Sequence, residues 1–196
     1  MLIWIAYYAV HSILASTTAK QFFKNNLGRQ YRYYRLGYSV FATITLVALL
    51  YFQYSFKSPL LLGYNGVKYF SALFLFLPGL IIMGISIKKY FMLLSGVRSI
   101  YQPVPVNELK INGIHRYMRH PLYSGTILFV CGLFFIFPYL NNFIAVVLLI
   151  LYVLIGIYFE EKKLIREFGS QYEDYMLNVP MLIPRFKSNR RLNKAG

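Results

Sequence analysis

Apolar stretches long enough to cross a lipid bilayer take up most of this chain of 196 residues. A transmembrane helix needs about 20 mostly apolar residues, and a window of about 19 residues finds such stretches at 1–16, 36–56 and 67–87. A longer apolar stretch, 122–159, exceeds one span and is interrupted by PYLNN at 138–142. We therefore predict an all-α integral membrane protein with five transmembrane helices, the last two of which form a helical hairpin.

The composition agrees with a membrane protein, since 58% of the residues are hydrophobic and 19% are aromatic. A soluble domain of this size does not need so much apolar surface. Gly79 and Gly84, in the third predicted span, are expected to allow close helix packing. The single cysteine, Cys131, lies inside the fourth span. No intramolecular disulfide can therefore form, no cysteine cluster offers a metal site, and we expect no bound metal.

The basic residues predict the orientation in the membrane. All but two of the 21 Lys and Arg residues, Lys57 and Lys68, fall in 17–35, in 88–120 or after Glu160. These segments share one side of the five-span topology, and loops rich in Lys and Arg face the cytoplasm. The predicted N-terminus is therefore outside and the C-terminus is cytoplasmic, with the bacterial inner membrane as the expected location.

The formal net charge of +15 does not by itself indicate nucleic-acid binding. Basic residues beside membrane spans are explained by topology and by anionic lipid head groups. No nucleic-acid recognition motif accompanies the charge. Membrane lipids are the expected partners, and nucleic acid is not.

The chain divides into three regions by the character of its sequence. Residues 1–89 form a region of three spans. Residues 90–186 hold a connector, the helical hairpin and a polar helix that begins at the pair Glu160 and Glu161, and this helix is expected in the cytoplasm. Residues 187–196 form a basic tail.

Two charged segments adjoin the apolar hairpin, GIHRYMRHPLYSG at 113–125 and FEEKKLIREFGSQYEDYM at 159–176. Ionisable groups beside a bilayer are costly and are functional by default. Two antiparallel helices joined by a short turn bring the chain back to the face where it started. The side chains expected to meet at the cytoplasmic interface are Arg119, His120, Tyr123, Glu160 and Glu161.

The residue types in these segments suit an amino-acid zwitterion. Such a ligand needs a cation or a helix N-terminus for its carboxylate and a carboxylate for its ammonium group. Pro121 suits the first turn of a helix, and Tyr117 and Tyr123 offer aromatic faces for an adenine ring or a sulfonium. These groups fit S-adenosylmethionine, and by themselves they also fit other zwitterions.

The same two segments carry a family resemblance. RHPLYSG followed by EEKKLIREFGSQYEDYM resembles the paired C-terminal signature of integral-membrane methyltransferases, which include isoprenylcysteine carboxyl methyltransferases and phospholipid methyltransferases. The N-terminal WIAYYAVHSILASTTAK is similar to a subgroup that contains NnrU-like proteins and methanethiol S-methyltransferases. The resemblance implies an enzyme that binds S-adenosylmethionine without a Rossmann domain. The absence of GxGxxG from the chain agrees.

Carried over by position, the resemblance implies that residues 120–123 line the cofactor site and that Glu160 holds the cofactor's amino group. The stretch 107–110 and His115 match a connector that also touches the cofactor in the family. Tyr117 and Arg119 are added to these residues because of their chemistry. The candidate cofactor-binding residues are then Asn107, Glu108, Leu109, Lys110, His115, Tyr117, Arg119, His120, Pro121, Leu122, Tyr123 and Glu160.

The sequence does not assign the catalytic residues, and the candidates are His11, His115 and Arg119, of which the two histidines could act as the base. A thiol acceptor must lose its proton, and imidazole titrates near neutral pH. His11 has an alternative role, a hydrogen bond across the helix bundle. Arg119 has an alternative role as a topology determinant and lipid anchor.

The methyl acceptor is predicted from a departure from the family pattern. Isoprenylcysteine enzymes place an arginine about one helical turn before the glutamate pair, whereas this chain reads IGIYFEE at 155–161. A prenylcysteine carboxylate would lack its expected partner, which favours a small or lipophilic thiol similar to methanethiol. The alternatives are an isoprenylcysteine carboxyl group or a phospholipid amine. A non-catalytic membrane sensor or assembly protein that kept the pocket is a hypothesis of another class.

Overall fold

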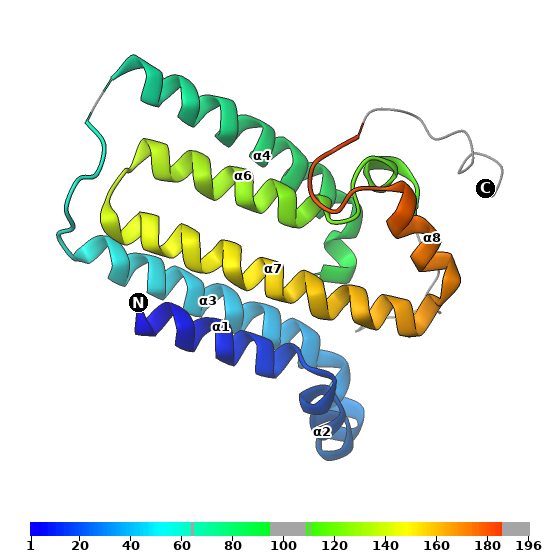
Figure 1. The fold of residues 1–196 in the computed structure, drawn as a ribbon. Helices are drawn as coiled ribbons and strands as arrows, with labels where there is room; N and C mark the ends of the chain where they lie inside the picture. Colours follow the sequence, from blue (N-terminus) through cyan, green and yellow to red (C-terminus); the bar gives the residue numbers. More distant parts are fainter. Residues whose placement is uncertain (64, 95–108, 110, 186–196) are drawn as a thin grey trace.

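The computed structural model describes residues 1–63, 65–94, 109 and 111–185, and helices make up most of this part of the chain. The predicted all-α fold is confirmed for these residues (Figure 1). The basic tail at 187–196 lies outside them. The α-helices are α1 Leu2–Ala15, α2 Thr17–Leu27, α3 Tyr34–Ser55, α4 Gly66–Leu94, α6 Pro121–Ile136, α7 Leu140–Phe168 and α8 Ser170–Asn178, with 3-10 helices η1 Gly28–Tyr33 and η2 Gly113–Arg116.

Three helical stretches are long and apolar enough to cross a membrane, namely Thr17–Ser55, Gly66–Lys88 and Leu140–Phe168. The apolar part of the first of these is α3. The helices α1 and α6 are also apolar but shorter, with 14 and 16 residues. The interruption at PYLNN falls at the turn between α6 and α7, so the predicted helical hairpin is present.

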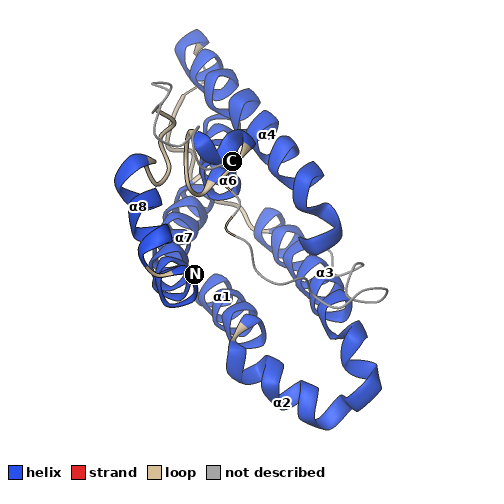
Figure 2. Ribbon diagram, turned by 90° about the vertical axis from the view of Figure 1, so that its right-hand side faces the viewer, coloured by secondary structure: helices blue, strands red, loops and turns tan. Residues whose placement is uncertain are grey.

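The long helices pack in the order α4, α6, α7, α1 and α3, and Figure 2 shows the same bundle from the side on which α8 lies. A chain of polar side chains connects three of them. Trp4 Nε1 donates to Gln53 Oε1 at 2.5 Å, and Gln53 Nε2 donates to Asn142 Oδ1 at 2.7 Å. Asn142 Nδ2 in turn donates to the Phe137 carbonyl at 2.8 Å. Because an unpaired amide is costly in hydrocarbon, these bonds hold α1, α3 and α7 in register at the end where α7 begins.

Glycines bring α4 and α6 into backbone contact. A Cβ atom placed on Gly125 would lie 2.8 Å from the Met83 backbone nitrogen, and one on Gly132 would lie 2.6 Å from the Phe76 nitrogen. A Cβ atom on Gly79 would overlap the Phe129 backbone. The expectation of close packing is therefore confirmed for Gly79. It is wrong for Gly84, where an added Cβ atom would meet nothing within 4 Å.

The chain turns sharply after α7, and α8 packs back against it. Gly169 makes this turn with φ +55°, a conformation that glycine adopts without steric cost. Tyr172, Tyr175 and Val179 are buried there. They pack against the end of α7, with Leu164 among the contacts, and against Leu109 and Ile111. This small core fixes where the chain leaves α8, and the segment that follows runs to the start of α6.

Candidate functional site

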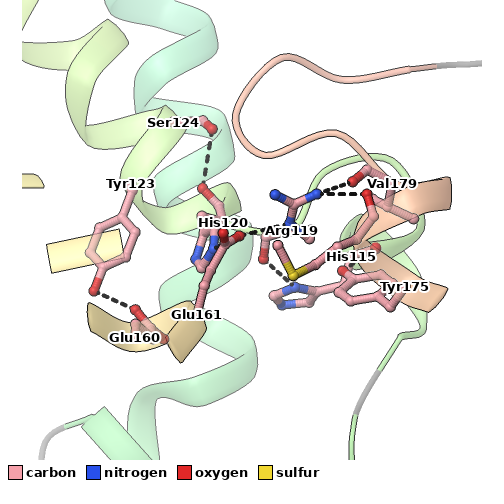
Figure 3. A network of polar contacts seen from close by, with 10 residues as sticks. His115, Arg119, His120, Tyr123, Ser124, Glu160, Glu161, Tyr175 and Val179 are labelled. Atoms are coloured by element: carbon pink, nitrogen blue, oxygen red, sulfur yellow. Dashed lines mark hydrogen bonds and ion pairs between the residues drawn. The ribbon is translucent and has the colours of Figure 1, made fainter. Parts of the chain in front are cut away.

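A cluster of polar side chains lies where α6 begins, as Figure 3 shows. Its members come from the segment before α6 and the first turn of α6, from the polar last part of α7, and from α8 with the residues that follow it. The side chains that sequence reasoning expected to meet here do so, through contacts among Arg119, His120, Tyr123, Glu160 and Glu161.

Glu161 lies at the centre of the cluster. Arg119 Nε donates to Glu161 Oε1 at 2.8 Å, and His120 Nε2 lies 3.0 Å from the same oxygen. The three side chains are only 5% to 13% exposed. A carboxylate withdrawn from water needs a cation and hydrogen bonds to offset its lost hydration, and Arg119 and His120 supply them.

Arg119 also joins α7 to the end of α8. Its Nη1 donates to the carbonyl oxygens of Met176 at 3.0 Å and Val179 at 2.6 Å. The last carbonyls of a helix lack partners within the helix and attract a cation. The guanidinium group of Arg119 is thus held by the protein itself, which makes it an anchor for the segment before α6.

Residues 179–185, which we call the C-terminal strap, run along the segment that leads into α6. The backbone N–H groups of Arg119 and His120 donate to the carbonyls of Pro180 at 2.9 Å and Met181 at 3.1 Å. Ser124 Oγ donates to the Leu182 carbonyl at 2.7 Å. Sequence reasoning missed this strap. The two prolines at 180 and 184 are the sequence feature that could have predicted it, because proline and the residue before it favour an extended chain.

Glu160 has a different environment from its neighbour. Successive residues on an α-helix point about 100° apart, so Glu160 lies on an exposed face when Glu161 faces Arg119. Tyr123 Oη donates to Glu160 Oε2 at 2.9 Å, and the Tyr123 ring stacks on His120 with centroids 5.7 Å apart. Glu160 is therefore an accessible carboxylate beside an aromatic face and the first turn of α6.

The connector before α6 contacts the polar cluster and α8 through His115. His115 Nδ1 lies 3.1 Å from the Arg119 carbonyl, and the His115 carbonyl accepts from Tyr175 Oη at 2.6 Å. Tyr117 is 41% exposed, and Leu109 packs on the core below α8. Of the other candidates, Asn107, Glu108 and Lys110 lie outside the described residues.

His11 lies on α1, apart from the cluster around Glu161. Its ring nitrogens lie 2.8 and 3.1 Å from Tyr38 Oη of α3, so the expected hydrogen bond across the bundle is present. The adjacent Ser12 donates through Oγ to Tyr152 Oη of α7 at 3.1 Å. Two polar pairs therefore join the last part of α1 to its neighbours.

The phenol of Tyr172 stays neutral beside the charged cluster. Burial raises the pKa of Tyr172, and the nearby Glu161 carboxylate raises it further. A second anion next to Glu161 would be repelled by it. The charged pair of the cluster is therefore Arg119 and Glu161, and His120 contacts the same Glu161 carboxylate.

Apolar helices of membrane length, with charged side chains gathered at one end, define an integral membrane protein. Residues 67–171, more than half of the chain, match the family described as phospholipid methyltransferase, and the chain belongs to this family. The predicted resemblance to integral-membrane methyltransferases is confirmed. The match begins in α4 and ends at the start of α8, so it takes in the residues around Glu161 and stops before the strap.

Curated relatives are methanethiol S-methyltransferases of bacteria. The chain is 36% identical over 80 residues to Methanethiol S-methyltransferase 2 of Bradyrhizobium diazoefficiens, which is 40% of this chain and 29% of the relative. It is 34% identical over 98 residues to the Crocosphaera subtropica enzyme, which is 46% of this chain and 37% of the relative. The chain thus spans about a third of the length of the relatives it matches. No solved structure shows significant similarity.

Proposed function

We propose that this protein is a membrane enzyme that transfers a methyl group from S-adenosylmethionine to a small or lipophilic acceptor, and that the acceptor is a thiol. The observation that carries the proposal is the pair Tyr123 and Glu160 beside the first turn of α6. Membership of the phospholipid methyltransferase family supports a methyl-transfer reaction. The names of the relatives support a thiol acceptor.

The proposed topology has five spans, α1, α3, α4, α6 and α7, with the N-terminus outside and α8 in the cytoplasm of a bacterial inner membrane. At 1.5 Å per residue, α1 and α6 are about 21 and 24 Å long, a little less than the hydrocarbon thickness of about 30 Å. Local thinning and flanking side chains accommodate such a difference. Residues 1–89 form the three-span region, 90–186 the methyltransferase core and 187–196 the tail.

The residues around α6 fit the amino-acid part of the cofactor. Glu160 is an exposed carboxylate for the ammonium group. The first backbone N–H groups of α6, at Leu122 and Tyr123, point out of the helix start and favour a carboxylate. His120 and Pro121 line the same place. Tyr117, at 41% exposure, offers a ring for the adenine.

The buried ion pair positions this site. Arg119 and Glu161 fix the segment before α6 against α7, and the strap fixes it against the end of α8. S-adenosylmethionine supplies an activated methyl group on a sulfonium sulfur. The protein's part is to hold the donor and acceptor in line. In well-oriented cases such positioning lowers the activation barrier by about 7 to 11 kcal/mol.

A thiol must give up a proton before it accepts the methyl group, and His11 is the proposed base. Its imidazole is hydrogen-bonded to Tyr38, which orients the ring. A neutral imidazole would take the proton of the thiol, and the thiolate would accept the methyl group as its bond to the sulfonium sulfur breaks, which leaves S-adenosylhomocysteine. His115 is the alternative base, although its Nδ1 already contacts the Arg119 carbonyl.

Titration of the detergent-solubilised protein with S-adenosylhomocysteine, followed by calorimetry, tests the cofactor site. We expect saturable binding that is weakened about tenfold or more by Glu160→Gln, because a hydrogen bond to a charged group contributes about 1.5 to 3 kcal/mol. His120→Ala is expected to weaken binding as well. Glu173→Gln on the exposed side of α8 is the matched control and is expected to bind as the wild type does.

Wild-type protein that is folded and yet does not bind S-adenosylhomocysteine would refute the methyltransferase proposal. It would favour the non-catalytic sensor or assembly protein. Binding followed by methylation of a phospholipid amine or an isoprenylcysteine carboxyl group, but of no thiol, would instead replace only the proposed acceptor.

A further inference from the structure

An apolar groove of about 410 Å³ runs between α1 and α3. Val10, Phe41, Leu49 and Phe52 are among the side chains that line it. Val10, Phe41 and Phe52 are 44% to 46% exposed, so the groove opens on the outer surface of the bundle. In the proposed topology that surface faces the hydrocarbon core of the membrane. A molecule that reaches the groove therefore arrives through the lipid.

The groove has one polar end. Its lining residues on α1 extend from Ile3 to His11 and those on α3 from Phe52 to Tyr38. Because α1 and α3 are antiparallel, His11 and Tyr38 meet at the same end, where they hydrogen-bond at 2.8 Å. This end lies toward the part of the molecule where α6 begins and the candidate site is found (Figure 1). The groove thus offers an apolar channel that stops at an imidazole and a phenol.

A row of residues on α7 runs from this polar end toward the candidate cofactor site. The His11 ring lies 6.3 Å from the ring of Tyr152. Tyr152, Gly156 and Glu160 follow one another at intervals of four residues, so they form one row about 12 Å long on the helix. A Cβ atom at Gly156 would meet nothing within 4 Å. At Gly156, between the aromatic side chain and the carboxylate, the row therefore has open space.

We propose that the groove between α1 and α3 binds the apolar chain of the methyl acceptor, with its thiol at His11 and Tyr38. The acceptor is then a lipophilic thiol rather than a one-carbon thiol. This inference rests on the proposed function. Pockets of about 300 to 1,000 Å³ suit ligands of drug size, and methanethiol has two non-hydrogen atoms. The volume and the membrane-facing opening both suit a chain of several carbons.

A series of alkyl thiols from methanethiol to octanethiol tests the proposal through the formation of S-adenosylhomocysteine by the protein in proteoliposomes. We expect KM to fall about tenfold or more along the series, in line with the favourable burial of each added methylene. Ala48→Phe places a ring in the groove and is expected to remove this gain. Leu80→Phe on the exposed side of α4 is the matched control and keeps the gain, which separates groove binding from simple partition into lipid.

A second measurement does not depend on turnover. Trp4 is the only tryptophan and lies on α1 beside the groove residue Ile3. 4-Bromobenzenethiol, whose bromine quenches tryptophan fluorescence, is expected to quench Trp4 saturably in the wild type and in Leu80→Phe. The saturable part is expected to disappear in Ala48→Phe. Ala6→Leu, on the opposite wall, serves as the blocking variant if Ala48→Phe does not fold.

The two measurements separate the inference from the function on which it rests. Equal KM values along the thiol series, or quenching that is the same in all variants, would overturn the groove proposal while methylation itself stands. If no thiol is methylated, the proposed thiol acceptor fails, and quenching that Ala48→Phe leaves unchanged would then overturn the groove as well.

Discussion

Glu160 and Glu161 are adjacent in the chain and have opposite roles in the structure. Glu161 is nearly buried and shares its Oε1 with Arg119 and His120. Glu160 is exposed and accepts from Tyr123. The rotation of α7 against the segment before α6 decides which carboxylate stabilises the fold and which is open to a ligand.

Neutralising each carboxylate is predicted to separate stability from binding. Glu161→Gln leaves Arg119 without its counter-ion and is expected to cost about 2 kcal/mol, since hydrogen bonds to charged groups contribute about 1.5 to 3 kcal/mol. Glu160→Gln is expected to change the stability by less than about 0.5 kcal/mol, as surface substitutions usually do. Thermal unfolding in detergent measures both. Equal losses of Tm in the two variants would contradict the assignment of roles.

At the scale of the helix, α4 and α6 are held together by backbone contact at glycines. Gly79, Gly125 and Gly132 lie in this contact, whereas Gly84 on the same helix faces open space. Since lipid tails are as apolar as the side chains, close packing is a main source of helix association in a membrane. The contact matters because α6 carries the candidate site at its N-terminus.

Leucine at the two glycines of α4 is predicted to have opposite effects. Gly79→Leu forces the helices apart and is expected to cost about 2 kcal/mol or more, because overpacking usually costs about 1 to 3 kcal/mol. Gly84→Leu is expected to be neutral or stabilising by up to about 1 kcal/mol, since leucine is the better helix former. Unfolding of both variants in the same detergent is the measurement. A destabilised Gly84→Leu would show that this face is covered.

The C-terminal strap is a second element on which the site depends. Ending the chain after Asn178 removes the carbonyls of Pro180 and Met181 that the N–H groups of Arg119 and His120 need. We expect this truncation to abolish S-adenosylhomocysteine binding. Ending the chain after Arg185 keeps the strap and is expected to bind within about twofold of the full chain, a difference of less than 0.5 kcal/mol. Binding that survives the shorter truncation would show that the strap is dispensable.

On the scale of the whole molecule, the polar groups divide between the two ends of the bundle. The ion pair of Arg119 and Glu161 lies at the end with α8. The bonds of Gln53 lie at the other end, beside a cavity of about 450 Å³ that Lys57 and Asn141 help to line. The two groups fix the bundle at both ends and leave the groove between α1 and α3 in the apolar middle.

The proposed orientation predicts which positions a membrane-impermeant maleimide reaches on intact cells. In a Cys131→Ser background, a cysteine at Lys57 is expected to react from outside, because the loop after α3 faces away from the basic segments. A cysteine at Glu173 in α8 is expected to react only after the membrane is opened. Labelling of Glu173→Cys on intact cells would reverse the topology.

The sequence predicted the apolar helices, the turn between the last two of them and the meeting of the two charged segments. Hydropathy located the apolar helices and the turn at 138–142, because burial in lipid depends on the composition of each segment. The paired motifs around the hairpin predicted that Arg119 and His120 meet the glutamate pair, because a hairpin returns to its starting face. These inferences need only local composition and connectivity.

The tertiary structure decided which groups face one another. Three observations depend on how each helix is rotated against its neighbours. Glu161 rather than Glu160 meets Arg119, and the strap reaches His120. Gly79 touches α6, whereas Gly84 does not. The sequence determined which segments are helical and apolar, because those properties are summed along one segment. It did not determine these contacts, because helix rotation is set by packing between segments distant in the chain.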